Sequence, residues 1–441
     1  MNQRKLLDDR TAYILRIALI LVMAVFMCAL AYKNYSIWDD ELFTLTAIDG
    51  SWTHLWEVIV ADLVHPPLHY VLLKGFVDLF STGHLGTVVL AKLFSVFWVV
   101  LLMILGSRIL AKRYGQRTAL VFVLLLSGNM IVGYSVEIRM YSLASCATAL
   151  AYLYANELVN EPVRKNWLPL TFWTVIGIYT NYFAAFALVF LWLVLLGWCW
   201  KQKRIKAWFC YAMACVILYL PWVITVLTNY GSITDYDPGL TVKRIIQFFA
   251  FPFSSHNEAV SLCLIAFTVL LIGMILVRTK KTEFFWAFLL NPVWVGILCI
   301  LSSFLFHKFI TGRYLLPGWA AFWAGLAIGT SYLKKTWFIP VLAVIDLLSC
   351  ICIYQTEAAD RKATRDLLAY TEAHQPMLAE RSIYNLIHYL KPEAELIENG
   401  DPDAAGKRFV YYWSDLYTQL SESDIIVSFP LSVHEICVFE K

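Results

Sequence analysis

Charged residues are scarce in this chain of 441 residues: aspartate, glutamate, lysine and arginine make up 15% of it, whereas hydrophobic residues make up 60%. Soluble domains have about 25% charged and about 45–50% apolar residues. The apolar residues stand in blocks long enough to cross a bilayer, which takes about 20 residues each. The composition predicts a polytopic α-helical membrane protein, and the net charge of +3 gives no reason to expect a nucleic-acid partner.

Regular cysteine spacing is also lacking. All ten cysteines except Cys437 fall in or beside apolar blocks, and Cys350 and Cys352 form a C-x-C pair instead of a redox C-x-x-C. We therefore predict neither a disulfide framework nor a zinc site. The chain also has no internal repeat and no low-complexity segment.

Apolar blocks predict about eleven transmembrane helices. The first follows Arg4 and Lys5 and could imitate a signal peptide, but it is longer than the apolar region of one, so we expect a retained helix. The predicted spans are 11–32, 86–107, 118–134, 139–157, 167–181, 182–200, 207–228, 259–277, 284–306, 314–333 and 337–354.

The basic residues predict the orientation of these spans. With a cytoplasmic N-terminus, every basic cluster between spans falls on the cytoplasmic side, as the positive-inside rule requires. The clusters lie at 108–117, 164–165, 201–206, 278–281 and 334–335. This solution makes 33–85 the first external loop, in which the short apolar segment 66–80 is expected to lie at the interface, like segment 241–251 further on.

The C-terminal part differs in composition from the rest. We predict a transmembrane domain over 1–354 and an extracytoplasmic domain over 355–441. A helix is expected at 358–374, and alternating apolar runs favour strands. The expected strands are 393–397, 408–413, 425–427 and 436–439. Helices that alternate with strands indicate a small α/β domain.

Three consecutive acids, Asp39, Asp40 and Glu41, follow the first span. Carboxylates in a loop are usually just solvated. The alternative is a general base in a partly buried site, since Trp38 and Phe43 flank the acids and burial raises a carboxyl pKa.

Basic residues mark two further loops on the predicted external side. Arg139, near Glu137, could snorkel, pair with that acid or hold a phosphate. Lys308 and Arg313, in the run His307–Pro317, break the positive-inside pattern, so they either anchor the chain at the interface or bind an anion.

A weaker candidate is the hairpin Tyr179–Phe183, where tyrosines also suit an aromatic belt. By the predicted topology all four motifs lie on one side of the membrane. This convergence favours one shared site.

The motifs W-D-D-E-L-F-T, D-x-x-H-P-P-L-H-Y, Y-S-x-E-x-R-M-Y and G-R-Y-L-L-P occur in this order over most of residues 10–335. They resemble bacterial membrane glycosyltransferases of the C superfamily, in the branch of protein O-mannosyltransferases and aminoarabinose transferases of lipid A. The resemblance implies a polyprenyl-phosphate sugar donor. It also implies transfer to a lipid, glycan or protein hydroxyl at the outer face of the cytoplasmic membrane.

The resemblance also assigns catalytic roles. The acidic pair of the family corresponds to Asp40 and Glu41, and Asp39 is an extra acid, so either aspartate could be the base. The H-P-P-L element begins at His65, where aminoarabinose transferases have lysine. Because histidine is a weaker phosphate ligand at neutral pH, the donor phosphate should depend more on arginines.

The remaining assignments concern binding residues. The expected phosphate ligands are Arg139, Arg313, Lys308, His65 and Lys74, and the expected substrate-binding residues are Asp62, Glu137, Tyr182 and Tyr314.

The predicted chemistry needs one base and one or two cations, because the donor already carries a phosphodiester leaving group. A single base implies direct displacement with inversion. A metal is not required, although Asp40, Glu41 and Asp62 could hold a divalent ion.

Three other classes of protein remain open. These are a polymerase or ligase of lipid-linked glycans, a transporter with ionisable groups near broken helices in mid-membrane, and a non-catalytic scaffold. Whether Asp40 and Arg313 face a shared cavity discriminates between them.

Overall fold

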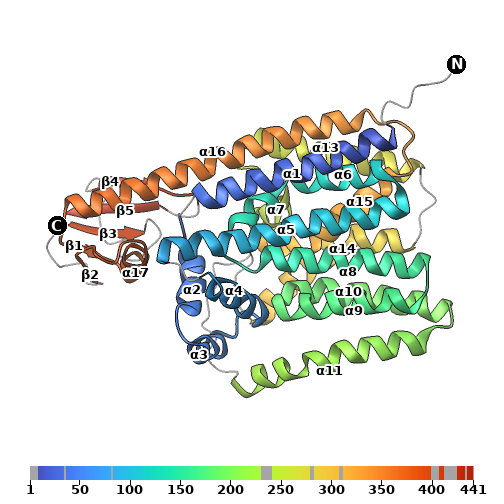
Figure 1. The fold of residues 1–441 in the computed structure, drawn as a ribbon, viewed down its shortest axis with the longest axis horizontal. Helices are drawn as coiled ribbons and strands as arrows, with labels where there is room; N and C mark the ends of the chain where they lie inside the picture. Colours follow the sequence, from blue (N-terminus) through green and yellow to red (C-terminus); the bar gives the residue numbers. More distant parts are fainter. Residues whose placement is uncertain are drawn as a thin grey trace.

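A long helical bundle with a small β-sheet at one end makes up the computed structural model (Figure 1). It describes residues 8–33, 36–80, 83–229, 241–278, 283–306, 311–398, 407–411, 425–432 and 435–440. The end of the bundle beside the sheet is called the sheet end below.

Seven helices of the described residues are long and apolar enough to cross a membrane, and a bent pair makes an eighth. The seven are α1 (Asp9–Lys33), α5 (His84–Tyr114), α10 (Tyr182–Lys201), α11 (Ile205–Asn229), α13 (Glu258–Arg278), α14 (Glu283–Phe306) and α16 (Phe338–Ala373). The bent pair consists of α6 (Gln116–Ser127) and α7 (Met130–Gly133), which continues into the 3-10 helix η1 (Tyr134–Val136) and is bent by 64°. The protein is therefore a multi-pass membrane protein.

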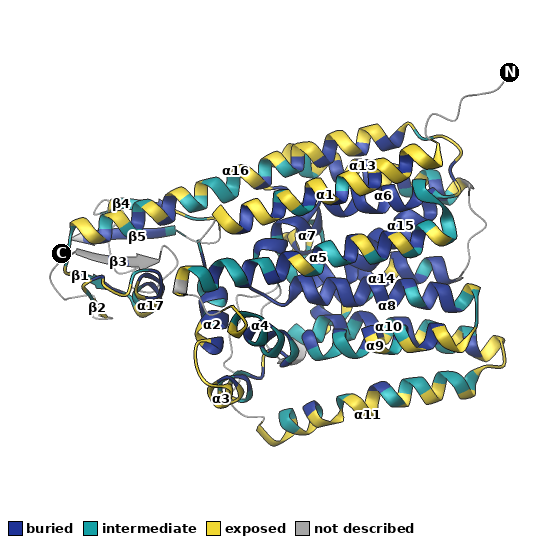
Figure 2. Ribbon diagram, in the orientation of Figure 1, coloured by how far each residue is buried: buried dark blue, intermediate teal, exposed yellow. Residues whose placement is uncertain are grey.

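The other three predicted spans are helices that are not among the candidates for crossing the membrane. They are α8 (Tyr141–Asn160), α9 (Arg164–Thr180) and α15 (Leu316–Thr330). With 17 and 15 residues, α9 and α15 fall short of the length of about 20 that a bilayer requires. Both α8 and α15 are almost wholly buried in the bundle (Figure 2), so protein and not lipid surrounds them. The prediction of about eleven spans thus corresponds to eleven helical segments, of which seven or eight meet the requirements for crossing.

Short helices cover the sheet end (Figure 1). After α1 come α2 (Asp39–Ile48), α3 (Trp52–Asp62) and α4 (Leu68–Asp78). Segment 66–80, predicted as a helix, is α4, with Pro67 as its N-cap, where a missing N–H costs least. Segment 241–251 contains α12 (Val242–Ala250), followed by η2 (Phe251–Phe253), and η3 (Gly312–Leu315) leads into α15.

The C-terminal region is joined to the bundle without a break. The span predicted at 337–354 and the helix predicted at 358–374 are one helix, α16, so no linker marks the predicted boundary. A five-stranded sheet follows in the order β2-β1-β3-β5-β4, parallel over its first three strands and antiparallel over the rest. Its elements are β1 (Met377–Ala379), α17 (Arg381–Leu390), β2 (Leu396–Glu398), β3 (Lys407–Tyr411), β4 (Ile425–Pro430) and β5 (Glu435–Glu440).

Helix α17 packs against α2 and α5, and this contact holds the sheet beside the acidic helix. The expected strands at 408–413, 425–427 and 436–439 are present, and the one expected at 393–397 begins at Leu396. Neither β1 nor α17 was predicted, and the three residues of β1 are too few to show alternation.

Candidate functional site

The acids after α1 form the first turn of α2, whose N-cap is Trp38. Carboxylates are favoured at a helix N-terminus by the helix dipole. Glu41 also accepts a hydrogen bond from the backbone N–H of Trp38 at 3.2 Å, which is the half of a capping box that the N3 carboxylate supplies. Consecutive residues of a helix point about 100° apart, so Asp40 and Glu41 face different surroundings.

Asp40 lies between two arginines from distant parts of the chain. Its Oδ2 is 3.0 Å from Nη2 of Arg313 and 3.9 Å from Nη2 of Arg139. Arg139 also donates to the backbone oxygen of Asp40 at 2.9 Å and to Thr44 Oγ1 at 3.0 Å. The Asp40 side chain is 34% exposed and that of Arg139 only 3%. The carboxylate is thus held by a buried cation while it remains open to a ligand.

His65 of the H-P-P-L element extends this cluster. Its Nε2 is 3.4 Å from Arg139 Nη2, and its Nδ1 is 3.8 Å from Oδ2 of Asp62. Burial lowers the pKa of His65, which favours the neutral ring beside the guanidinium group. Asp40, Arg139, Arg313, His65 and Asp62 therefore form one cluster, which we call the arginine cluster.

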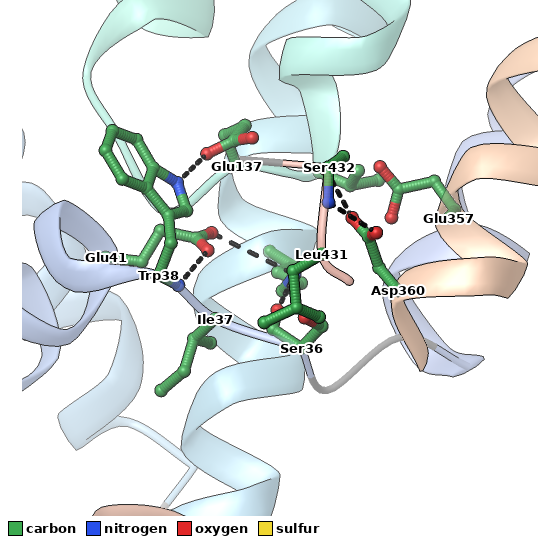
Figure 3. Close-up of a pocket in the computed structure, with 11 residues that line it drawn as sticks. Ser36, Ile37, Trp38, Glu41, Glu137, Glu357, Asp360, Leu431 and Ser432 are labelled. Carbon is green, nitrogen blue, oxygen red and sulfur yellow. Dashed lines mark hydrogen bonds and ion pairs between the residues drawn. The ribbon is translucent and has the colours of Figure 1, made fainter. Parts of the chain in front are cut away.

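Trp38 contacts this cluster and also a second group of charges, of which Figure 3 shows Glu41 and Glu137. The Arg313 guanidinium group lies 4.6 Å from the centre of the Trp38 ring, at cation–π distance. At the edge of the ring, Trp38 Nε1 donates to Glu137 at 2.6 Å. Glu137, expected in the substrate site, thus accepts from Trp38, whereas the ion pair of Arg139 is with Asp40.

Glu41 is at the centre of the second group and is 2% exposed. Its Oε1 accepts from the backbone N–H of Ile138 at 2.7 Å and lies 3.9 Å from Lys92 Nζ. Burial raises the pKa of Glu41 to about 8, although Lys92 opposes the shift. Burial raises the pKa of Glu137 as well. Glu41, Glu137 and Lys92 are called the carboxyl cluster below.

A small pocket adjoins the carboxyl cluster (Figure 3). Besides Trp38 and Glu41 it is lined by Glu357 and Asp360 of α16 and by Ser432, which donates to Asp360. Asp40 and Arg313 do not line it; they contact each other directly on the far side of Trp38.

Several buried polar atoms around Arg139 have no hydrogen-bond partner among the described residues. They are both ring nitrogens of His69, the hydroxyls of Tyr70 and Tyr141, and Nε of Arg139 and of Arg313. Buried polar groups nearly always have a partner in protein, water or ligand. The arginine cluster therefore has spare hydrogen-bonding capacity for a polar ligand.

Lys74 lies apart from the arginine cluster. Its Nζ donates to the backbone oxygens of Ile48 at 3.1 Å and Gly50 at 2.6 Å, and to Asp78 at 3.2 Å. This ammonium group holds α4 to the end of α2.

The remaining predicted residues have separate positions. Tyr182 donates to the backbone oxygen of Leu63 at 3.1 Å, which joins α10 to the loop before His65. Tyr314 stacks on Phe183 at 4.0 Å. Asp39 lies in the first turn of α2, and Lys308 falls outside the described residues.

The three carboxylates considered for a metal do not converge. Asp40 faces arginines, Glu41 faces Ile138 and Lys92, and Asp62 faces His65. Within the part of the chain that the structure describes, no group of three or more His, Cys, Asp or Glu residues could hold a metal ion.

The sequence did not single out two buried residues of this region, Lys92 and His69. Lys92 is an ionisable residue within a predicted span, a feature that itself indicates a functional or structural partner. His69 lies four residues after His65, in the first turn of α4, and burial of its ring depends on tertiary packing.

Comparison with known proteins bears on the fold that holds this cluster. No family model matches the chain, and no curated protein matches it in sequence. The crystal structure of ArnT from Cupriavidus metallidurans in the apo state matches with a TM-score of 0.60 and 11% sequence identity, and covers 96% of this chain and 97% of that one. The chain shares the fold of ArnT.

ArnT is an aminoarabinose transferase of the C superfamily, so the resemblance seen in the motifs is confirmed at the level of the fold. The same protein bound to undecaprenyl phosphate matches with a TM-score of 0.47, 11% identity and the same coverage. At this identity the likeness to ArnT concerns the fold alone.

Proposed function

We propose that the protein transfers a sugar from a polyprenyl-phosphate donor to an acceptor hydroxyl at the outer face of the cytoplasmic membrane, with inversion. The observation that carries the proposal is the Asp40 carboxylate between Arg313 and Arg139, at the sheet end of an ArnT-like fold. A base beside two cations suits a reaction that deprotonates a hydroxyl and releases an anion.

In the proposed mechanism, the donor phosphate binds the guanidinium groups of Arg313 and Arg139. Arginine holds phosphate well because its planar fork can donate two parallel hydrogen bonds. The phosphate competes with Asp40 for Arg313, which frees the carboxylate to accept the acceptor proton. The acceptor oxygen then attacks the anomeric carbon, and the bond to the phosphate breaks with its electrons on the phosphate.

Asp40 suits the role of base better than Glu41. Its side chain is partly exposed and contacts both arginines. Glu41 is buried, accepts two backbone N–H groups and, with a pKa of about 8, holds its proton at neutral pH. We assign Glu41 the positioning of Trp38 and Ile138. The proposed reaction uses the base and the two cations and needs no metal ion.

The outer-face location depends on the predicted orientation. Arg381 at the start of α17 has an 81% exposed side chain, so a cysteine in its place should react with an impermeant maleimide in intact cells. The parent chain, with its native cysteines, gives the background. Labelling only after permeabilisation would place the sheet end in the cytoplasm and contradict the proposal.

Envelope analysis tests the activity whichever sugar is transferred. Cells that lack the protein should accumulate a polyprenyl-phosphate sugar and lose one envelope modification, both visible by mass spectrometry. The wild-type chain should restore the modification and Asp40→Asn should not. An unchanged set of polyprenyl-phosphate sugars and envelope glycans would refute the proposal.

One observation keeps a transporter as a second candidate. Asp346 of α16 is buried against Gly128, where α6 breaks from α7, and both of its carboxyl oxygens lack a hydrogen-bond partner among the described residues. Transporters place ionisable groups at such breaks. Asp346→Asn should leave glycan transfer intact in a glycosyltransferase. Loss of the phenotype in Asp346→Asn but not in Asp40→Asn would favour transport.

A further inference from the structure

His65 lies in the short loop between α3 and α4, and the course of this loop is fixed from several sides. The loop begins at Leu63, whose φ of 49° lies in the left-handed region that residues other than glycine seldom adopt. Tyr182 of α10 donates to the backbone oxygen of Leu63 at 3.1 Å. The two prolines that follow His65 restrict its backbone as well. A strained residue persists only where its surroundings hold it, so the chain holds His65 in one position beside Arg139.

The contact between His65 and Arg139 determines which ring nitrogen of His65 carries the proton. Nε2 of His65 lies 3.4 Å from Nη2 of Arg139, at the long end of hydrogen-bond distance. A guanidinium group can only donate hydrogen bonds, so Nε2 must accept and carries no proton. The proton of the neutral ring is therefore on Nδ1, which faces Oδ2 of Asp62 at 3.8 Å. Asp62, His65 and Arg139 thus form a chain in which each group has a defined role.

This arrangement does not suit His65 as a ligand of phosphate. To attract an anion the ring would have to be protonated, and the imidazolium group would then lie against the guanidinium group of Arg139. Burial lowers the pKa of His65, and the charge of Arg139 acts in the same direction, although Asp62 opposes both. The neutral ring keeps a single proton, on Nδ1, and that proton faces Asp62 instead of the arginines.

The other contacts of Arg139 show what His65 adds. Nη1 of Arg139 donates to the backbone oxygen of Asp40 at 2.9 Å and to Oγ1 of Thr44 at 3.0 Å, which uses both of its protons. These two partners, both from α2, hold one corner of the guanidinium group. His65 holds the corner at Nη2 from the loop before α4. Nε has no partner among the described residues, so the group is oriented with one donor left for a ligand.

We propose that His65 and Asp62 are positioning residues that act through Arg139: the neutral ring, kept in its Nδ1–H form by Asp62, accepts from Arg139 and fixes the guanidinium group for the donor phosphate. The proposal rests on the glycosyltransferase function proposed above. It gives the histidine of the H-P-P-L element a role that the lysine of aminoarabinose transferases could not have, because an ammonium group cannot accept a hydrogen bond.

Binding of undecaprenyl phosphate to the full-length chain in nanodiscs tests this role by the sign of the effect. His65→Asn removes the acceptor at the Nε2 position and should lower the affinity about tenfold, whereas the longer amide of His65→Gln reaches that position and should recover most of it. His65→Lys places a second cation against Arg139 and should lower the affinity at least about tenfold. A histidine that itself bound phosphate would give the opposite result, because lysine is the stronger phosphate ligand at neutral pH. His54→Lys, at an exposed position of α3, controls for the added charge.

Two further comparisons separate positioning from a general effect on the fold. In an Arg139→Gln chain, His65→Asn should cause no further loss of affinity, because it acts through the guanidinium group that is missing. Asp62→Asn keeps an oxygen that can accept from Nδ1 of His65, so it should restore much of the affinity that Asp62→Ala loses. Unfolding temperatures are measured on the same preparations, so that a loss of fold is seen as such.

The protonation of His65 can be observed by NMR without ligand or turnover. With isotope-labelled histidine nitrogens, the signals that His65→Gln removes belong to His65, and at pH 7 they should show a protonated Nδ1 and an unprotonated Nε2. A protonated Nε2, undiminished binding in His65→Asn or stronger binding in His65→Lys would each overturn the positioning role and leave the proposed function standing. A wild-type chain that binds no undecaprenyl phosphate would instead refute the proposed function.

Discussion

Trp38 lies between two clusters of charged residues, and the acids of the two clusters differ in how far they are buried. In the arginine cluster, Asp40 is partly exposed and buried donors around it lack partners among the described residues. In the carboxyl cluster, Glu41 is buried and accepts hydrogen bonds from two backbone N–H groups. Adjacent acids on one short helix therefore differ in accessibility and in hydrogen-bond satisfaction.

This difference distinguishes a binding group from a structural one. A buried acid that is fully hydrogen-bonded specifies how chain segments meet, as Glu41 does for α2 and the loop at Ile138. A partly exposed acid between cations has its partners in place but can exchange them for a ligand. We expect Asp40 to act in the reaction and Glu41 to stabilise the fold. The following experiments test this division of roles.

The largest expected effect concerns the base. Asp40→Asn should keep its fold and lose at least ~99% of sugar transfer, within the 10²–10⁴-fold range for a lost general base. Glu41→Gln should retain transfer, with a lower unfolding temperature because one of its two accepted hydrogen bonds is lost. The readouts are restoration of the envelope modification and thermal unfolding. Activity in Asp40→Asn together with a dead Asp39→Asn would move the base by one residue.

The sequence alone supports the helical segments and the order of the motifs, but it cannot divide neighbouring acids between two clusters. Hydrophobic blocks show where helices lie because burial in lipid or protein depends on composition. Which way Asp40 and Glu41 face depends on Arg313 and Lys92, far along the chain. The pairing of Arg139 with Asp40 instead of Glu137 likewise follows from tertiary packing.

The second effect concerns the donor phosphate. Arg313→Ala removes a charge-assisted contact worth about 1.5–3 kcal/mol, so affinity for undecaprenyl phosphate in nanodiscs should fall by roughly one to two orders of magnitude. Arg313→Lys should recover part of it, because a point charge cannot donate in a bidentate fork. Arg381→Ala, far more exposed, is the control. Unchanged binding in Arg313→Ala would leave this arginine as an interfacial anchor.

The third effect is a pH dependence of the stability of the fold, which we expect to arise from the carboxyl cluster. Because the pKa of Glu41 rises from 4.5 to about 8 on burial, the folded protein holds a proton that the unfolded chain releases in this window. Stability should be greatest below pH 4.5, fall as the pH rises toward 8 and level off above it. Glu137, whose pKa is also raised, contributes with the same sign. Thermal unfolding from pH 5 to 8 should show this slope, and Glu41→Gln should flatten it. Equal slopes in the two proteins would place the titration elsewhere.

The smallest expected effect concerns Lys74, a buried cation near α2 that we do not expect to bind the donor phosphate. Lys74 donates to the carbonyl oxygens of Ile48 and Gly50, so Lys74→Met should leave the buried acceptor of Ile48 unsatisfied and cost about 1–3 kcal/mol of stability. Affinity for undecaprenyl phosphate should stay at the wild-type value, because no contact joins Lys74 to Asp40 or Arg313 among the described residues. Thermal unfolding and binding are measured on the same nanodisc preparation. A loss of binding as large as that of Arg313→Ala, without a loss of stability, would extend the phosphate site to α4 and end the division drawn at Trp38.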